Sequence, residues 1–364
     1  MDAGDYCCIY AGDQERLQDN FIARAWALLG YHAVNVGDNE VLYGLPSLVA
    51  TAPPLPLTSA NVTAEVAGAV APYRRFDVGG VRVGVVGVVD EGLLPADAAG
   101  VEAVKAGPAL AAAVEELAAD ADVIVCLAHL KDLDHARAFA ASCPAAVDVI
   151  VAAHRGGVTP QAEHIRGRWL VYTRPWNRYV GVLRLDVDRR GRVVKAANSY
   201  LPLTRETVPD EEMSALVAAY RDSLLALVQA GGILRAPTAA TPSGNAYVGV
   251  ETCTSCHAGV AASWRATAHA RAYDDLRRNG RTFDPHCVGC HVTGYGFKGG
   301  FDPTAPVPAL AAVGCEECHG PGGGHAAGAA VETPSPAEDT CRRCHTPERN
   351  PDSDYGAYRA RITH

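Results

Sequence analysis

The last third of the chain repeats one motif four times: two cysteines separated by two residues and followed directly by a histidine. The copies are Cys253, Cys256 and His257; Cys287, Cys290 and His291; Cys315, Cys318 and His319; and Cys341, Cys344 and His345. Two thiols at this spacing can bond to the two vinyl groups of one porphyrin, and the adjacent imidazole then reaches the iron. Zinc ribbons also use such cysteine pairs, but zinc needs no histidine directly after each pair. The sequence therefore predicts four covalently attached c-type haems.

Each haem iron also needs a sixth ligand or an open site. The only methionines, Met1 and Met213, lie outside the motif region, so ligation by histidine and methionine, which raises the potential, is not expected. Four further histidines do lie there: His269, His286, His325 and His364. Their number matches four bis-histidine haems, although counting does not assign the pairs. Short segments separate successive motifs, so we expect porphyrins close enough for rapid electron hopping.

Composition limits the classes of partner. The chain has 364 residues, 48% of them hydrophobic, and a formal net charge of −9. Nucleic acid is not expected as a partner because the net charge is negative and the basic residues are dispersed. No apolar run is long enough to span a membrane. The expected partners are a redox protein that donates electrons and one that accepts them.

The first two hundred residues alternate strand and helix signals. Strand-length apolar segments cover 81–89, 121–127 and 148–153, and residues 101–117 carry apolar side chains at helical spacing. This order predicts a βαβ crossover and therefore an α/β fold with a layered arrangement. Further strands are expected at 169–173, 180–187 and 192–196.

A helix and a linker follow this region. Asp210 is placed to cap a helix that runs to about Val228, and residues 236–245 are rich in Pro, Ala, Thr and Ser. We expect three parts: an α/β domain at 1–205, a connecting helix and linker at 206–246, and a small, mostly helical and loop-rich multihaem domain at 247–364. The last part has few long apolar segments, so haem is expected to supply most of its core.

The motif region resembles a known family. The stretches 264–270, with Trp264 and His269, 287–294, and 314–325, which reads Gly-Cys-Glu-Glu-Cys-His-Gly-Pro-Gly-Gly-Gly-His, are similar to the tetrahaem cytochromes that take electrons from hydroxylamine oxidation. The resemblance covers about 247–364. It implies that His269 and His325 are distal ligands, and His364 resembles a terminal ligand. His286 departs from the pattern, and one haem in such proteins can be five-coordinate.

Polar residues at the expected strand ends of the α/β region form a second candidate site. Asp5, Asp38, His129 and His154 carry carboxylate and imidazole groups, which suit one divalent metal such as Zn, Mn or Fe. The segments around them, at 2–5, 29–44, 121–129 and 147–154, resemble the 5′-nucleotidase branch of the metallophosphoesterases. That resemblance implies a complete ligand set for the second metal of the family, with Asp5 as the bridging carboxylate and Asp38 in place of an asparagine.

Departures from that family weaken the expectation of hydrolysis. Asn39 stands where the family has the catalytic histidine, and an amide cannot act as a general acid. Gly156 stands where a later histidine would bind the first metal, whose earlier Asp and His ligands would precede the first residue. Phosphoester cleavage in such enzymes uses two ions. We therefore expect one structural or vestigial metal and no catalytic residues in this region.

Together these features predict a tetrahaem electron carrier, periplasmic or otherwise extracytoplasmic, with a degenerate nucleotidase-like domain. Haem attachment to such motifs happens outside the cytoplasm, so we expect a signal segment upstream of Met1. Two alternatives remain. One is a redox enzyme that acts on a small nitrogen or sulfur compound at an open haem, and the other is a phosphoesterase tethered to a cytochrome.

Overall fold

The computed structural model contains two compact units, Met1–Tyr220 and Arg221–His364. It describes residues 1–7, 12–45, 55–64, 68–95, 100–155, 157–173, 179–204, 206–231, 233, 238–241, 243–330, 336–346, 349 and 354–362. Two residues discussed above lie outside the described residues. They are His364, an expected distal ligand, and Gly156, where the metallophosphoesterase family has a metal-binding histidine.

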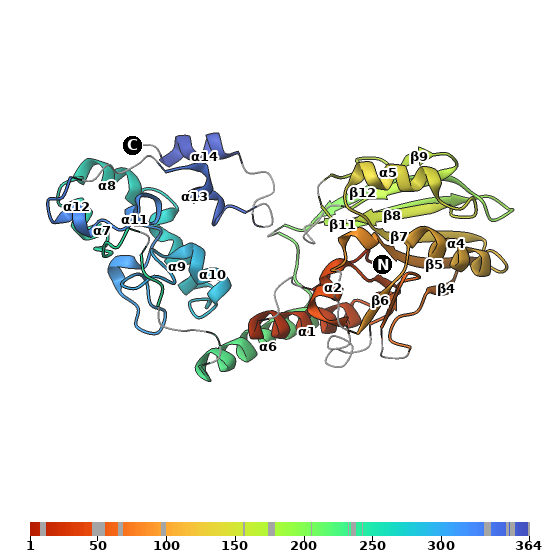
Figure 1. Cartoon of the computed structure of the whole chain (residues 1–364), viewed down its shortest axis with the longest axis horizontal. Helices are drawn as coiled ribbons and strands as arrows, with labels where there is room; N and C mark the ends of the chain where they lie inside the picture. The colour runs from red at the N-terminus through yellow and green to blue at the C-terminus, as the bar shows by residue number, and fades with distance from the viewer. Residues whose placement is uncertain are drawn as a thin grey trace. The chain divides into compact units, whose positions relative to one another are not determined.

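A six-stranded sheet forms the centre of the first unit (Figure 1). Its order is β4-β5-β7-β8-β10-β9. The bounds are β4 Tyr73–Val78, β5 Val81–Val89, β7 Val123–His129, β8 Val149–Ala153, β9 Glu163–Ile165 and β10 Arg168–Tyr172. The four central strands are parallel, and β4 and β9 are antiparallel edge strands. Because both faces of the central strands are covered, they are continuous apolar runs, which is why the sequence revealed them.

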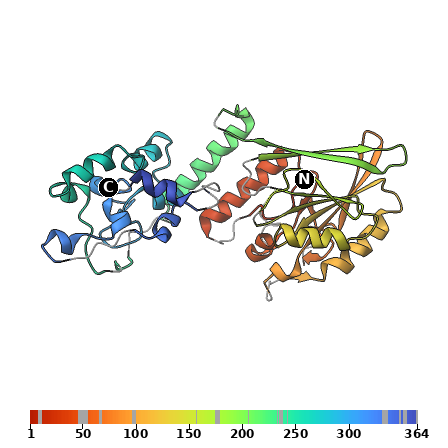
Figure 2. The same cartoon turned by 90° about the horizontal axis from the view of Figure 1, so that it is seen from above.

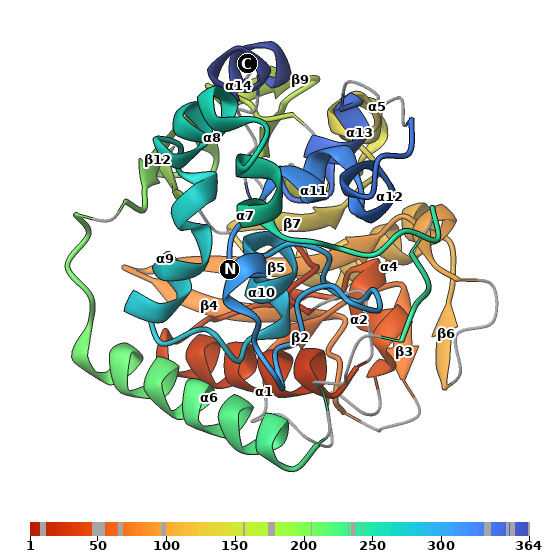
Figure 3. The same cartoon turned by 90° about the vertical axis from the view of Figure 1, so that its left-hand side faces the viewer.

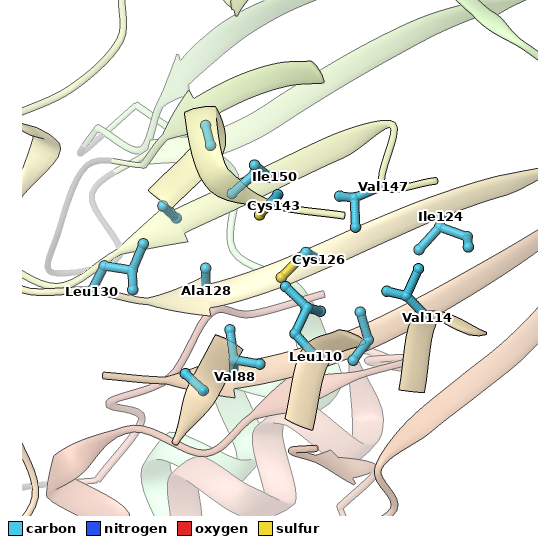
Figure 4. Close-up of a cluster of buried hydrophobic side chains, with 14 of the residues drawn as sticks. Val88, Leu110, Val114, Ile124, Cys126, Ala128, Leu130, Cys143, Val147 and Ile150 are labelled. Carbon is cyan, nitrogen blue, oxygen red and sulfur yellow. The ribbon is translucent and has the colours of Figure 1, made fainter. Parts of the chain in front are cut away.

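Helices α4 (Ala106–Leu117) and α5 (Leu133–Ser142) cover one face of this sheet. Figure 4 shows Leu110 and Val114 of α4 directed toward Ile124 and Cys126 of β7, with Ile150 of β8 in the same cluster. The predicted crossover is confirmed, since α4 lies between the parallel strands β5 and β7. The expected helix at 101–117 began too early, however. Residues Val101–Ala103 form strand β6, which pairs with β3 (Val62–Ala64), and the helix starts at Ala106.

A long hairpin covers the opposite face (Figure 2). Its strands are β11 (Tyr179–Val187) and β12 (Val193–Pro202), joined by the predicted turn at Asp188 and Gly191. Apolar residues of the hairpin pack on the sheet beside Trp169, so the unit has a helix–sheet–sheet layering. The predicted last strand, 192–196, is extended to Pro202 because it pairs along the whole of β11.

The remaining elements of the first unit lie beside these layers. They are α1 (Asp13–Leu28), β1 (Val34–Asn35), α2 (Asp38–Tyr43), β2 (Leu57–Thr58) and the 3₁₀ turn η1 (Glu91–Leu93). The predicted helix is α6 (Glu211–Gln229), and its first turn is capped by Asp210, whose carboxylate accepts from the N–H of Met213 at 2.9 Å. The helix begins alongside α1, where the rings of Phe21 and Tyr220 lie 5.5 Å apart.

The second unit consists of short helices and loops (Figure 3). They are α7 (Val250–Thr254), α8 (Ala258–Arg265), η2 (His269–Arg271), α9 (Ala272–Arg278), α10 (Pro285–His291), η3 (Pro308–Leu310), α11 (Cys315–His319), α12 (Gly323–Ala326), α13 (Glu338–Arg342) and α14 (Tyr355–Ile362). The described core is small, with Phe301 and Val288 fully buried at its centre. Among the described residues, none of the helices combines the length and the apolar character needed to cross a membrane.

Candidate haem and metal sites

Strand ends of the first unit bring the four predicted metal ligands together. His129 is the last residue of β7, His154 follows β8, and Asp38 opens α2 just after β1. Together with Asp5 they offer ligand atoms that all lie within 4.8 Å of one another. Carboxyl ends of parallel strands meet at one edge of a sheet, which explains why residues so far apart in sequence converge.

Hydrogen bonds orient His129 at the centre of this cluster. The side chain is fully buried, with Nδ1 3.0 Å from the carbonyl oxygen of Ala3 and Nε2 2.8 Å from Oδ1 of Asp38 and 3.3 Å from Oδ2 of Asp5. Burial lowers the pKa of His129, but the bonds to Asp38 and Asp5 outweigh it and raise the pKa to about 10. A ring that donates through Nδ1 to a backbone carbonyl presents Nε2 to a metal, a common arrangement around metal-binding histidines.

Two of these ligands have unusual backbone conformations. Asp5 has φ +68° and His154 has φ +153°, and both values lie in the region that non-glycine residues rarely adopt. Gly4 beside Asp5 has no room for a side chain, since a Cβ there would lie 2.8 Å from Nδ1 of His129. Backbone strain of this kind is concentrated at functional sites. The geometry and the donor set thus fit a divalent metal.

Glu40 is a supporting residue that the sequence reasoning did not single out. It is fully buried and its carboxylate accepts from the N–H groups of Asp5 at 3.0 Å, Cys7 at 3.1 Å and Gly37 at 2.7 Å. Burial, and then the charge of Asp5, raise the pKa of Glu40. Its bonds tie the loop that carries Asp5 to the start of α2. An acidic residue at the third position of a helix is the available sequence signal.

Asn39 lies beside this site without taking part in the ligand cluster. Its Nδ2 donates to the carbonyl of Cys7 at 3.1 Å, and its backbone N–H donates to Oδ1 of Asp5 at 3.1 Å. The amide is therefore engaged in holding the Asp5 loop. It supplies no titratable proton for a leaving group.

Two histidine pairs stand out in the second unit. The ring centres of His257 and His325 lie 6.1 Å apart, and those of His269 and His345 also lie 6.1 Å apart. With metal–imidazole bonds of about 2 Å and ring centres about 1 Å behind the ligating nitrogens, two imidazoles on opposite sides of one iron have centres about 6 Å apart. The pairs therefore fit bis-histidine haem. Burial and the neighbouring His345 lower the pKa of His269, which favours its neutral, ligating form.

The cysteines of different motifs also approach one another. The thiols of Cys253 and Cys315 are within hydrogen-bonding reach, as are those of Cys290 and Cys344. The first motif thus adjoins the third, and the second adjoins the fourth. This arrangement fits closely packed haem groups.

The second motif differs from the others because the extra histidine closest to it in sequence, His286, lies on the same helix as the motif. His286 and the motif residues Cys287, Cys290 and His291 all lie on α10. Nδ1 of His291 lies 2.6 Å from the carbonyl oxygen of Ala272, which leaves Nε2 as the nitrogen that would bind a haem iron. A distal ligand must approach from the side opposite the attachment helix, whereas His286 belongs to that helix.

Comparisons with known proteins agree with this division of the chain. The family model for cytochrome c554 and c-prime matches residues 252–320, which include the first three motifs. Cytochrome c-554 of Nitrosomonas europaea is 44% identical over 91 residues, which are 21% of this chain and 39% of that protein. The chain therefore spans about two fifths of the length of this relative.

Solved structures match the first unit. A 5′-nucleotidase precursor from Thermus thermophilus is similar with a TM-score of 0.51 and 25% identity, over 66% of this chain and 51% of that chain. The sulfate thiohydrolase SoxB of Thermus thermophilus has a TM-score of 0.51 and 20% identity, over 65% and 43% of the respective chains. The predicted α/β class and both family resemblances are confirmed.

Proposed function

Because a cytochrome c554 family domain, which binds c-type haem, is joined here to a 5′-nucleotidase-like fold, we propose that the protein is an extracytoplasmic tetrahaem electron carrier. The observation that carries this proposal is the spacing of two histidine pairs, His257 with His325 and His269 with His345, at the separation that one iron requires. Haem supplies reversible one-electron chemistry, and histidine on both sides favours a low potential. The chain's own task is to hold four such groups close together.

Ligand assignments follow from the pairs. His325 serves the haem attached at Cys253 and Cys256, and His269 serves the haem attached at Cys341 and Cys344. His286 and His364 then remain as distal ligands for the two haems whose proximal ligands are His291 and His319. Redox proteins that donate and accept electrons are the proposed partners, and the charge of −9 suits a basic docking surface on one of them.

The test of this proposal is a spectroelectrochemical titration with haem quantitation. We expect four haems per chain, all reduced and reoxidised reversibly. A haem content well below four, or haems that cannot be reduced without a bound substrate, would contradict the carrier proposal.

The first unit is proposed to hold one divalent metal, Zn, Mn or Fe, at Asp5, Asp38, His129 and His154. These residues bind and orient the ion, and Asn39 offers no proton to a leaving group. We therefore expect no phosphoester hydrolysis above background with AMP or bis(p-nitrophenyl) phosphate when Mn or Zn is supplied. Turnover that depends on Asp38 would restore the phosphoesterase alternative.

One observation favours a second candidate, a redox enzyme with an open haem. His286 shares the attachment helix α10 with His291, so it is not placed to approach an iron at the second motif from the opposite side. An exchangeable sixth site there would admit a small nitrogen or sulfur compound. A high-spin ferric signal that shifts when nitric oxide or hydroxylamine is added would support this candidate.

A further inference from the structure

One buried carboxylate joins the two segments that carry His257 and His325. Glu316, between the two cysteines of the third motif, is only 5% exposed. It accepts from the backbone N–H of Val248 at 3.0 Å, of Gly249 at 2.8 Å and of Gly322 at 2.8 Å. The first two residues precede α7, in which the first motif begins with Cys253, and Gly322 precedes α12, which bears His325. The segments that lead to both members of this histidine pair are therefore anchored to the same side chain.

The backbone around this carboxylate is tightly packed. Gly249 has φ +80°, and a Cβ there would lie 2.7 Å from the Cβ of Ala309. The N–H of Gly323 donates to the carbonyl of Ala246 at 2.9 Å, and a Cβ on Gly323 would lie 2.8 Å from that oxygen. Glycine at 323 lets its segment meet the backbone at Ala246, and glycine at 249 lets the start of α7 lie against Ala309. The carboxylate can then bond to both.

The second histidine pair is anchored to the same short stretch. Val313 accepts from the indole N–H of Trp264 at 2.9 Å and donates its N–H to the carbonyl of His269 at 3.2 Å. Glu317 forms an ion pair with Arg343 of the fourth motif. Residues 313–317 thus contact segments that carry both histidine pairs, while the thiol of Cys315 lies within reach of Cys253.

We propose that Glu316 is a positioning residue that holds His325 opposite His257, at the distal face of the haem attached to the first motif. This inference rests on the proposed ligation by His325 and adds the residue that enforces it. His325 itself is exposed and lies in a helix of only four residues, so its own surroundings do little to restrain it. The bond from Gly322 to Glu316 supplies a side-chain restraint, next to the backbone bond from Gly323 to Ala246.

A carboxylate suits this position better than any neutral side chain. Two oxygens receive three backbone donors, and bonds to a charged acceptor are stronger than those between neutral groups. Glutamine at this position would keep the shape but place an NH₂ group against a backbone N–H. Glu316→Gln is therefore a nearly isosteric change that weakens the restraint, because one of the two acceptor oxygens and the negative charge are lost.

The test uses the haem-loaded full chain and carbon monoxide as a probe of ferrous haem that has lost its distal ligand. His325→Ala defines the full effect, a gain of one carbon monoxide-binding haem over the unmodified protein. Glu316→Gln is expected to weaken ligation by His325 about tenfold or more, which corresponds to loss of one charge-assisted hydrogen bond. It should therefore give a partial gain at the same haem. Glu251→Gln, an exposed acid two residues from Cys253, should match the unmodified protein.

The outcomes distinguish a failure of the proposed ligation by His325 from a failure of the positioning role of Glu316. If His325→Ala gains no carbon monoxide-binding haem, the proposed ligation fails. If it gains one but Glu316→Gln retains four haems and gains none, the positioning inference is overturned. Should Glu316→Gln lose haem, Glu316→Asp takes its place, because its shorter carboxylate cannot reach Gly249 and Gly322 together. Loss of haem from both variants would also overturn the inference. Glu316 would then be needed for haem attachment, whereas the proposed role is to position His325.

Discussion

The two units build their sites in opposite ways. In the first unit a sheet with its own apolar core delivers Asp38, His129 and His154 from distant strand ends to one point. In the second unit each motif provides its attachment residues locally, and a small described core around Phe301 holds short helices. The fold creates the first site, whereas in the proposed carrier the motifs and their haems create much of the second fold. A metal ligand should therefore be removable without unfolding, and haem should not.

The largest expected effect is the loss of haem. Expression without haem attachment should leave the unit at 221–364 unfolded and open to proteolysis, because its side chains alone form too little core. The unit at 1–220 should stay folded. Limited proteolysis followed by mass spectrometry of the surviving fragment measures this. Survival of an intact haem-free second unit would contradict the claim that this unit depends on haem for its fold.

Core truncations should sharpen the same contrast. Leu110→Ala, in the cluster of Figure 4, should lower the free energy of unfolding of the first unit by about 2–5 kcal/mol and leave the haem spectrum unchanged. Phe301→Ala should lower the stability of the second unit by about 3–5 kcal/mol and reduce haem retention. Thermal unfolding followed at haem and far-ultraviolet wavelengths separates the two. Equal loss of haem from both variants would argue against independent units.

Removal of a metal ligand should be a purely local change. His129→Ala should weaken binding of Mn, Zn or Fe by about 100-fold or more, because substitutions even of residues behind the ligands cost about 10–100-fold. The haem spectrum should not change. Metal content after dialysis measures the effect, and His32→Ala, an exposed histidine, is the matched control. Unchanged metal content in a variant lacking both Asp5 and His129 would exclude the proposed metal site.

The pH dependence of the first site has a definite sign. The pKa of His129 is raised from 6.5 to about 10 in the metal-free fold, so its charge stabilises that fold fully below pH 6.5 and progressively less up to about pH 10. A metal ligand must be deprotonated, so metal affinity should rise over the same range. Calorimetric titration with Mn at several pH values checks this. Affinity that falls with rising pH would contradict the ligand role of His129.

The smallest expected effect is that of restoring the family's histidine. Asn39→His should leave phosphoester hydrolysis at background, since hydrolysis in this family relies on two ions and one ligand set is proposed here. It should also loosen the Asp5 loop slightly, because the bond to the carbonyl of Cys7 is lost. Initial rates with Mn present are the measurement. A rate above that of the unmodified protein would mean that a second ion binds.

Much of this architecture could be read from the sequence, for identifiable reasons. The buried strands β5, β7 and β8 were visible because parallel strands covered on both faces are continuous apolar runs. Strand β6 was missed, since Val101 and Ala103 also fit the helical spacing that continues into α4. Its pairing with β3 is a long-range contact that no local pattern reports.

The candidate sites, too, could be predicted where neighbouring residues encode them and not where distant contacts do. The proposed covalent haem attachment is encoded by adjacent residues, so the motifs were evident. The pairing of His257 with His325 depends on contacts across the unit and needed the structure. Glu40 and Glu316 were overlooked because each acts through backbone donors that are distant in sequence or belong to loops. A buried acid that bonds mainly to backbone leaves little residue pattern beyond its place in a helix, which for Glu40 is the third position.

The most direct test of the central claim is a low-temperature EPR spectrum of the oxidised protein together with its haem content. The account predicts four haems per chain, with low-spin ferric signals from the haems paired through His257 with His325 and through His269 with His345. High-spin signals from these haems, or a content below four, would contradict the proposed tetrahaem carrier.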